Sequence, residues 1–391
     1  MRGAAAVLLA VTVGALPLSA SAPAAAHSVH AADCPGAARR VPYALLVDVS
    51  AGRTLCARGS DIAFSPASMT KAMTALVVFD LIKAGKLDEN AVVTVRPETA
   101  ARWAGKGTTL NLTEGEQVTI AQLLAGTATV SANDAAVALA ESALGSSEAF
   151  VAAMNARARA LGMNHSRFAT PNGFPDQGRT LVSAADLVRL GEALIGDHPD
   201  LYRRYIGKKT MVWRGQTLSS HDPFAGVLPG ADGIKTGHTY EAGFNFLGAV
   251  ERGGRRLILV VGGARTDTDR ANAARDMAEW GYAAWDSRPF LPAGAVVGAA
   301  RVQGGAAREV PLAVPRGYSL ATEAGRPVAL NGTVHYDGPL RAPLTKGQAA
   351  GYLRVSTGEG ASYDLPLVTA RAVGKAGPID RIVNGLLGLV S

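Results

Sequence analysis

The chain has 391 residues, of which 48% are hydrophobic and 18% charged, and its 39 Lys and Arg exceed its 32 Asp and Glu by seven. This apolar fraction excludes a disordered chain, and 45 Gly and 20 Pro without a three-residue period exclude a collagen-like one. The net charge of +7 comes without a block of Lys or Arg, so no nucleic acid partner is expected.

The first 32 residues have the features of a secretory signal peptide. Arg2 provides a short basic region, the run Ala4–Leu16 is apolar, and small residues then offer cleavage sites near Ala26 or Ala32. The apolar run is too short for an uncleaved membrane span of ~20 residues. We therefore predict secretion across the cytoplasmic membrane, into the periplasm or the cell-wall space.

The following residues predict a mixed α and β domain. Tyr43–Val49 and Thr54–Arg58 have the composition of two strands joined as a hairpin. Cys34 and Cys56 can pair in an oxidising compartment, and two cysteines are too few for a structural zinc site. Further helices are predicted over residues 119–124, 134–144, 147–161, 184–195 and 268–285, and further strands over 242–250 and 255–261.

A helix is predicted from Pro66, with Ser65 as its N-cap, to about Ala84. It is apolar nearly all round, which indicates burial, and it presents Ser68 and Lys71 on one face. Burial disfavours the charged amine and lowers the pKa of Lys71, and a neutral amine beside a hydroxyl is a general base beside a nucleophile. The alternative is a serine at a helix start and a lysine that extends to solvent.

Two other short motifs occur once each in the chain. Ser131-Ala132-Asn133 lies between helical segments, where it can relay a proton and hold a substrate amide, or cap the helix that begins at Asp134. Lys235-Thr236-Gly237 precedes a predicted strand and suits an anchored carboxylate, or forms an ordinary turn. The order of the three motifs and their spacing favour one shared site over three coincidences.

The three motifs in this order resemble those of the penicillin-recognising serine acyltransferases. The segments Pro66–Leu76, Thr170–Phe174 and Asp232–Asn245 closely resemble the low-molecular-weight D-alanyl-D-alanine carboxypeptidases, and Ala342–Gly351 resembles their C-terminal module. The resemblance implies an α+β fold, with a β-lactamase/transpeptidase-like catalytic domain, a small all-β C-terminal domain and a terminal amphipathic helix. It implies no cofactor and no metal.

Composition predicts the domain boundaries. It changes at Asp286–Pro289, beyond which short strand-like runs alternate with Gly and Pro turns. We predict a signal peptide over 1–32, a serine acyltransferase domain over 33–288, a β-rich domain over 289–377 and an amphipathic helix over 378–391. One apolar stripe along that helix predicts weak peripheral contact with the membrane, or packing on the β-rich domain or on a second copy; it consists of Ile379, Ile382, Val383, Leu386, Leu387 and Val390.

Taken residue by residue, the resemblance implies acyl transfer in two steps. Ser68 attacks the penultimate D-Ala carbonyl of a peptidoglycan stem peptide with Lys71 as the base, and β-lactams acylate the same serine. Ser131 passes a proton toward the leaving amine, and Asn133 positions Lys71 and the substrate amide. The backbone N–H groups of Ser68 and His238 form the oxyanion hole.

The resemblance also assigns residues to the terminal carboxylate of the substrate. Lys235 and Thr236 are expected to hold this carboxylate, and Gly237 allows the backbone to approach the substrate closely. In the family, an arginine contacts this carboxylate. Arg265 aligns with that arginine when the extra residue Ala264 is treated as an insertion.

The predicted function is hydrolysis of the terminal D-Ala by a serine-type carboxypeptidase. A class A β-lactamase shares the three motifs but needs a glutamate in an E-x-x-L-N loop between the second and the third, and none occurs there. A peptidoglycan D,D-endopeptidase shares the chemistry. A penicillin-binding sensor or wall-binding protein is the non-enzymatic alternative.

Overall fold

The computed structural model describes residues 9–15, 33–323, 330–357 and 362–377. Contacts divide the chain into two units. One holds Ala31–Val49 and Leu55–Tyr282, and the other holds the described residues of Met1–His30, Ser50–Thr54 and the residues from Ala283 onward. The boundary predicted between residues 288 and 289 lies inside strand β11 (Trp285–Leu291), which pairs with β14 (Tyr318–Glu323) of the second unit.

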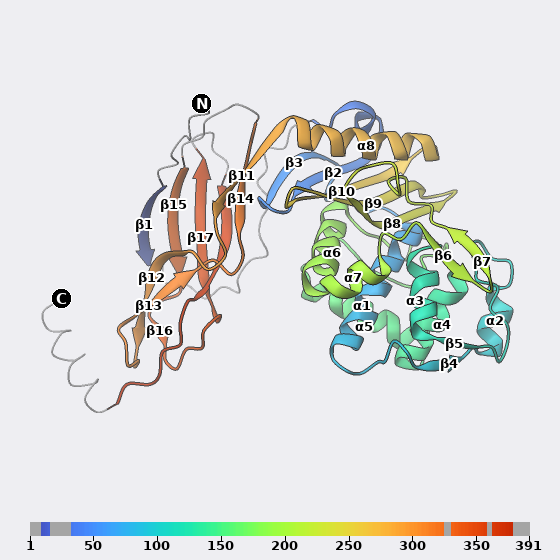
Figure 1. Ribbon diagram of the computed structural model, residues 1–391, viewed down its shortest axis with the longest axis horizontal. Helices are drawn as coiled ribbons and strands as arrows, with labels where there is room; N and C mark the ends of the chain where they lie inside the picture. The colour runs from blue at the N-terminus through green and yellow to red at the C-terminus, as the bar shows by residue number, and fades with distance from the viewer. Residues whose placement is uncertain (1–8, 16–32, 324–329, 358–361, 378–391) are drawn as a thin grey trace, which may run out of the picture. The chain divides into compact units, whose positions relative to one another are not determined.

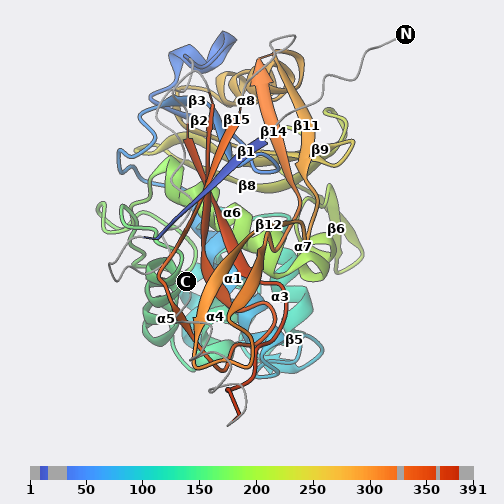
Figure 2. The same ribbon diagram turned by 90° about the vertical axis from the view of Figure 1, so that its left-hand side faces the viewer.

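The first unit is built on a five-stranded sheet of order β3-β2-β10-β9-β8, in which β8 spans Ala231–Thr239. Helix α8 covers one face and the remaining long helices cover the other (Figures 1 and 2). Because both faces are covered, β9 and β10 are buried almost continuously instead of alternating with polar residues. The predicted hairpin and the two later strands are confirmed, with bounds β2 Tyr43–Asp48, β3 Arg53–Arg58, β9 Gly243–Arg252 and β10 Arg255–Ala264.

The helices of this unit follow the predicted pattern closely. Serine and threonine side chains cap three of them: Thr119 with Gln122 forms a capping box, and Ser146 and Ser183 accept from backbone N–H groups. The prediction that α8 reaches Trp285 is wrong, because that residue begins β11. The helices are α2 Pro97–Trp103, α3 Ile120–Ala128, α4 Asn133–Leu144, α5 Ser147–Ala160, α6 Ala184–Asp197, α7 Pro199–Tyr205 and α8 Asp267–Ala283, beside the two-stranded pairs β4 Val92–Thr94 with β5 Gln117–Thr119 and β6 Thr210–Trp213 with β7 Gln216–Ser219.

The central helix α1 (Thr70–Lys83) is buried along Thr70–Phe79, as its apolar composition predicts. The predicted N-cap at Ser65 is wrong. A separate 3-10 turn over Ala67–Met69 precedes α1, and Ala67 has a φ of 49°, so the chain bends before the helix begins. Ser68 therefore lies on a short turn in front of α1 rather than inside it.

The second unit is an all-β domain, as predicted. Its main sheet has the order β1-β15-β17-β18-β13-β12-β16, and the inward side chains of β15 alternate with outward ones, so that one face packs on a core. Strand β1 (Leu9–Ala15) pairs in parallel with β15 and lies within the predicted signal peptide, whose removal stays a prediction. The other bounds are β12 Val296–Gln303, β13 Glu309–Ala313, β15 Leu330–Tyr336, β16 Leu340–Arg341, β17 Ala349–Thr357 and β18 Ser362–Thr369.

The predicted amphipathic helix over 378–391 lies outside the described residues. Within the described ranges, no single helix has both the length and the apolar character needed to cross a bilayer; α4 and α5 meet these criteria only as a pair bent by 86°.

The predicted pairing of the two cysteines is confirmed. Cys34 and Cys56 form a disulfide with 3% and 0% of their surfaces exposed, and it joins the segment before β2 to strand β3.

Reducing this disulfide is expected to lower the free energy of unfolding by about 3 kcal/mol, because a 22-residue separation restricts the unfolded chain. Urea unfolding with and without a reductant measures the effect. The double variant Cys34→Ser/Cys56→Ser is the control, since it has no bond to reduce. If the reductant destabilises that variant equally, the bond is not the cause.

Candidate active site

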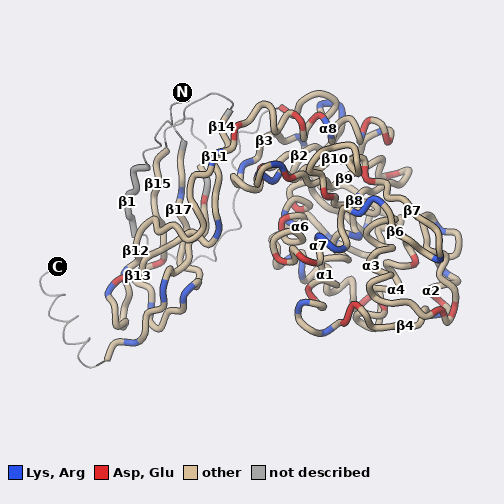
Figure 3. Tube along the Cα trace, viewed as in Figure 1, with Lys and Arg blue, Asp and Glu red and all other residues tan. Residues whose placement is uncertain are grey.

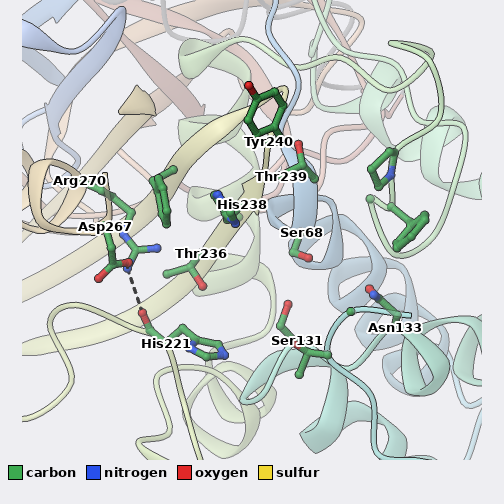
Figure 4. A pocket seen from close by; sticks show the side chains of 17 residues that line it. Ser68, Ser131, Asn133, His221, Thr236, His238, Thr239, Tyr240, Asp267 and Arg270 are labelled. Carbon is green, nitrogen blue, oxygen red and sulfur yellow. Dashed lines mark hydrogen bonds and ion pairs between the residues drawn. The ribbon is translucent and has the colours of Figure 1, made fainter. Parts of the chain in front are cut away.

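Three of the sequence motifs meet at one pocket of about 530 Å³ in the first unit (Figure 4). Its walls come from the turn before α1, the loop before α4, strand β8 (Ala231–Thr239) and the first turns of α8. The lining residues are Ser68, Gly107, Thr108, Ser131, Asn133, Gly173, Phe174, Pro175, His221, Thr236, Gly237, His238, Thr239, Tyr240, Phe244, Asp267 and Arg270.

Lys71 is buried next to the lining residues Ser68 and Asn133, with 1% of its own surface exposed. Its Nζ is 2.9 Å from Ser68 Oγ, 2.8 Å from Asn133 Oδ1 and 2.7 Å from the backbone oxygen of Asn172. A neutral amine has two N–H bonds, and the two asparagine oxygens can accept both. The remaining lone pair then faces the hydroxyl of Ser68, which is the arrangement of a base beside a nucleophile.

The charge state of Lys71 follows from its surroundings. Burial lowers its pKa well below the usual range, and the nearby charge of Lys235 lowers it further, while Asp134 opposes the shift. The Asp134 carboxylate accepts from the backbone N–H groups of Leu110 and Leu112, at 2.9 and 3.0 Å. Burial is the largest cause, so the amine is held in the form that accepts a proton.

The second motif contributes side chains to the pocket and not a helix cap. Ala132 is the N-cap of α4 and makes no side-chain cap bond, whereas Asn133 donates from Nδ2 to the backbone oxygen of Lys106 at 2.9 Å. Asn133 is therefore held between Lys106 and Lys71. Ser131 has a φ of 68° and lines the pocket with Ser68 (Figure 4). The capping alternative is not what the structure adopts.

The third motif lies inside β8, rather than in a turn before the next strand. Lys235 and Thr236 are polar, so the sequence around them does not have the composition expected of a strand. The segment nevertheless forms β8, which is the last strand in the sheet order. Gly237 has a specific steric role: a Cβ there would lie 2.3 Å from the backbone oxygen of Pro66 and 3.0 Å from the backbone nitrogen of Met69. The missing side chain lets β8 pack directly against the turn that carries Ser68.

Two basic side chains, those of Lys235 and Arg270, lie near Thr236. Lys235 is 5% exposed and donates to the backbone oxygen of Thr236 at 3.1 Å. Burial, reinforced by the charge of Arg270, lowers the pKa of Lys235 to about 7. A site with two positive groups in a cleft is suited to a carboxylate.

The arginine of this pocket is Arg270, in α8, and not the predicted Arg265. Arg265 is exposed and is not among the lining residues. Arg270 is buried, forms an ion pair with Asp267, and donates to the backbone oxygen of His221 at 3.3 Å. Its buried Nε has no hydrogen-bond partner among the described residues. Arg265 precedes α8, which begins at Asp267, whereas Arg270 lies one helical turn into α8 and lines the pocket.

Sequence reasoning missed other groups of the site as well. The backbone oxygen of Asn172 accepts from Lys71, and a carbonyl leaves no trace in the residue type. His221 lines the pocket, and burial lowers its pKa. The ring of His238 stacks on Phe244 at 3.9 Å, which fixes the strand end beside Ser68.

Away from the pocket, charged residues of both signs lie along α8 and at the ends of β9 and β10 that meet in their connecting turn (Figure 3). Several form ion pairs, such as Arg252 with Glu279 at 2.7 Å and Arg255 with Asp48 at 2.6 Å. The pocket differs from this surface because it brings three basic side chains close together, those of Lys235, Arg270 and Lys71.

Two family models match the chain. One, described as D-alanyl-D-alanine carboxypeptidase, matches residues 30–266, and one for the C-terminal domain of penicillin-binding protein 5 matches residues 285–375. The D-alanyl-D-alanine carboxypeptidase DacA of Escherichia coli K12 is 32% identical over 347 residues, which is 87% of this chain and 85% of that protein. DacB2 of Mycobacterium tuberculosis is 33% identical over 61% of this chain and 81% of its own. The structure of penicillin binding protein 5 from Haemophilus influenzae superimposes with a TM-score of 0.74 at 29% identity, covering 86% of this chain and 98% of that one.

Proposed function

The chain belongs to the D-alanyl-D-alanine carboxypeptidase family and is a serine-type carboxypeptidase; on that premise we propose that Ser68 carries its acyl-enzyme. The observation that carries this assignment is the position of Lys71 Nζ, 2.9 Å from Ser68 Oγ, with two oxygen acceptors for its N–H bonds. The substrate is a peptidoglycan stem peptide that ends in D-Ala-D-Ala, and β-lactams acylate the same serine.

In the acylation step, Ser68 Oγ forms a bond to the carbonyl carbon of the penultimate D-Ala as its proton moves to Lys71 Nζ. The carbonyl oxygen becomes an oxyanion, and the backbone N–H groups of Ser68 and His238 stabilise it. The C–N bond to the terminal D-Ala then breaks. The proton on Lys71 passes through Ser131 to the leaving amine, which restores the neutral lysine.

In the deacylation step, water attacks the ester carbonyl and gives a proton to the base. The C–O bond to Ser68 breaks, and the proton returns to Oγ. The net reaction is hydrolysis of one peptide bond, and no redox partner or metal takes part in this scheme.

The terminal carboxylate of the substrate binds at Thr236, between Lys235 and Arg270. Both cations are buried, so they interact with an anion more strongly than exposed ones do. The unpartnered Nε of Arg270 supports this assignment, because a bound carboxylate near it supplies an acceptor.

Incubation with a β-lactam, followed by peptide mass spectrometry, tests the proposal directly. The adduct is expected on Ser68, and an adduct on Ser131 would overturn the assignment. The same preparation is given a D-Ala-D-Ala peptide and a crosslinked muropeptide. Release of free D-Ala from the first is expected; cleavage of only the second would point to an endopeptidase.

The rate on carboxylate substrates is expected to fall as the pH rises through about 7. Lys235 has a pKa of about 7, so it is a cation below that pH and loses its charge above it, which weakens carboxylate binding. The pH profile of kcat/KM for a D-Ala-D-Ala peptide should show this descending limb. The peptide with a C-terminal amide is the control and should lack it. Superimposable profiles would remove Lys235 from the carboxylate site.

We also propose that the chain is exported, with residues 1–32 as its signal peptide, and that the tail over 378–391 lies on the outer face of the cytoplasmic membrane. The support is the composition of both segments. The relatives are named D-alanyl-D-alanine carboxypeptidases, and the peptidoglycan stem peptide proposed as substrate lies outside that membrane.

Deleting residues 378–391 is expected to leave turnover of a soluble peptide unchanged and to abolish sedimentation with anionic liposomes, since the apolar stripe supplies the buried area. Zwitterionic liposomes serve as the control for charge. If the protein with its tail does not sediment either, the tail is a packing surface instead of a membrane contact.

A further inference from the structure

A fully exposed aromatic ring stands at the mouth of the pocket. Tyr240 has a relative exposure of 101%, yet it is one of the lining residues, and it lies above Ser68 in Figure 4. The other large apolar side chains that are exposed in the described part of the chain do not line the pocket; they are Ile62, Val92, Val212, Val227 and Val296. Packing within the protein therefore gives no reason for a ring at this position.

The turn that carries Tyr240 is well fixed. Thr239 Oγ1 accepts from the backbone nitrogen of Ala242 at 3.0 Å. Gly243 has a φ of 65°, and a Cβ there would lie 2.7 Å from the backbone oxygen of Ala264. These contacts fix the backbone on the C-terminal side of Tyr240. The backbone that carries the Tyr240 ring therefore has a defined position beside the pocket.

The order of residues along β8 indicates which part of a substrate reaches this ring, and this step rests on the proposed function. The terminal carboxylate lies at Thr236, and the scissile carbonyl accepts from the N–H of His238. Tyr240 follows the end of β8 at Thr239, two residues after His238 on the side away from Thr236, and it lines the same pocket. A peptide that pairs along the open edge of β8 therefore brings the residue before D-Ala-D-Ala to Tyr240.

We propose that Tyr240 is a specificity-determining residue that binds the side chain of the residue preceding D-Ala-D-Ala, and that it favours a side chain ending in an ammonium group. The face of an aromatic ring attracts a cation that lies over it. Glu241, the next residue of the turn, is also exposed and supplies a negative charge one residue from the ring. An uncharged side chain gains neither interaction.

The test compares two peptides that end in Lys-D-Ala-D-Ala, one with the lysine amine free and one with it acetylated. The protein is expected to prefer the free amine by roughly 5-fold in kcat/KM, the effect of a cation over an exposed ring. The preference should lie in KM, because the contact is remote from the reacting atoms. Tyr240→Ala should bring the ratio close to one, and Tyr240→Phe should retain it because the ring remains.

Binding of the same two peptides to Ser68→Ala separates this inference from the proposed function. If the unsubstituted protein does not turn over either peptide, but Ser68→Ala still binds the free-amine peptide more tightly, the carboxypeptidase mechanism fails and Tyr240 keeps its role. Two results overturn the inference. One is a ratio of kcat/KM for the two peptides that is unchanged in Tyr240→Ala, and the other is no preference for the free amine in the unsubstituted protein.

Discussion

Replacing Lys71 by arginine is expected to slow acylation of Ser68 by roughly 10²- to 10⁴-fold, the usual contribution of a general base. A guanidinium keeps its proton at any pH at which the protein is folded, so it has no lone pair to offer Ser68 Oγ. It is also too large for the position between Asn133 and the carbonyl of Asn172. The rate of β-lactam adduct formation measures the effect.

The matched control is Lys83→Arg, the same substitution at the other end of α1. Lys83 is exposed and donates to the backbone oxygen of Asp197, away from the pocket. Its acylation rate should equal that of the unsubstituted protein. Acylation retained in Lys71→Arg at neutral pH would remove Lys71 from the role of base.

Replacing Gly237 by alanine is expected to lower kcat/KM by roughly 10²- to 10³-fold. The new Cβ would lie 2.3 Å from the backbone oxygen of Pro66 and 3.0 Å from the backbone nitrogen of Met69, so strand and turn must move apart. Backbone atoms cannot rotate away as a flexible side chain can. The backbone N–H groups of Ser68 and His238, which we propose as the oxyanion donors, lie on opposite sides of this contact, and loss of one such donor has an effect of that size.

Gly196→Ala, in α6, is the control for this substitution, because a Cβ there meets nothing within 4 Å. It should keep full activity. Melting temperatures of both variants show whether Gly237→Ala is folded. A folded Gly237→Ala protein with unchanged kcat/KM would contradict the role of this close contact.

The parts of the site that sequence reasoning predicted are those with side-chain chemistry at short spacing. Ser68 and Lys71 are three residues apart, and the burial of α1 follows from its composition, so their contact was expected. The strand β8 was missed because Lys235 and Thr236 are polar and their burial comes from elements far away in the chain. Ser65 was predicted to be the N-cap because the residue type of Ala67 gives no indication that the chain bends there before the helix begins.

The groups that were missed act at long range or through the backbone. The carbonyl of Asn172 meets Lys71 across 101 residues, and any residue type supplies a carbonyl. Arg270 faces the pocket because α8 begins at Asp267, a boundary that propensity does not locate to a residue. The β-rich unit was predicted from its turns, but strand pairings such as β15 with β17 depend on contacts that no local pattern contains.

The contacts of Lys71 make covalent labelling a measure of folding as well as of function. In the proposed mechanism, Ser68 becomes reactive only when Asn133, 62 residues from Lys71, and Asn172, 101 residues from it, have both reached the amine. A chain in which one of these segments is displaced contains the same serine without its base. A fluorescent β-lactam therefore counts the molecules whose catalytic unit is completely assembled, and the labelled fraction of a preparation gives its native content without a separate assay.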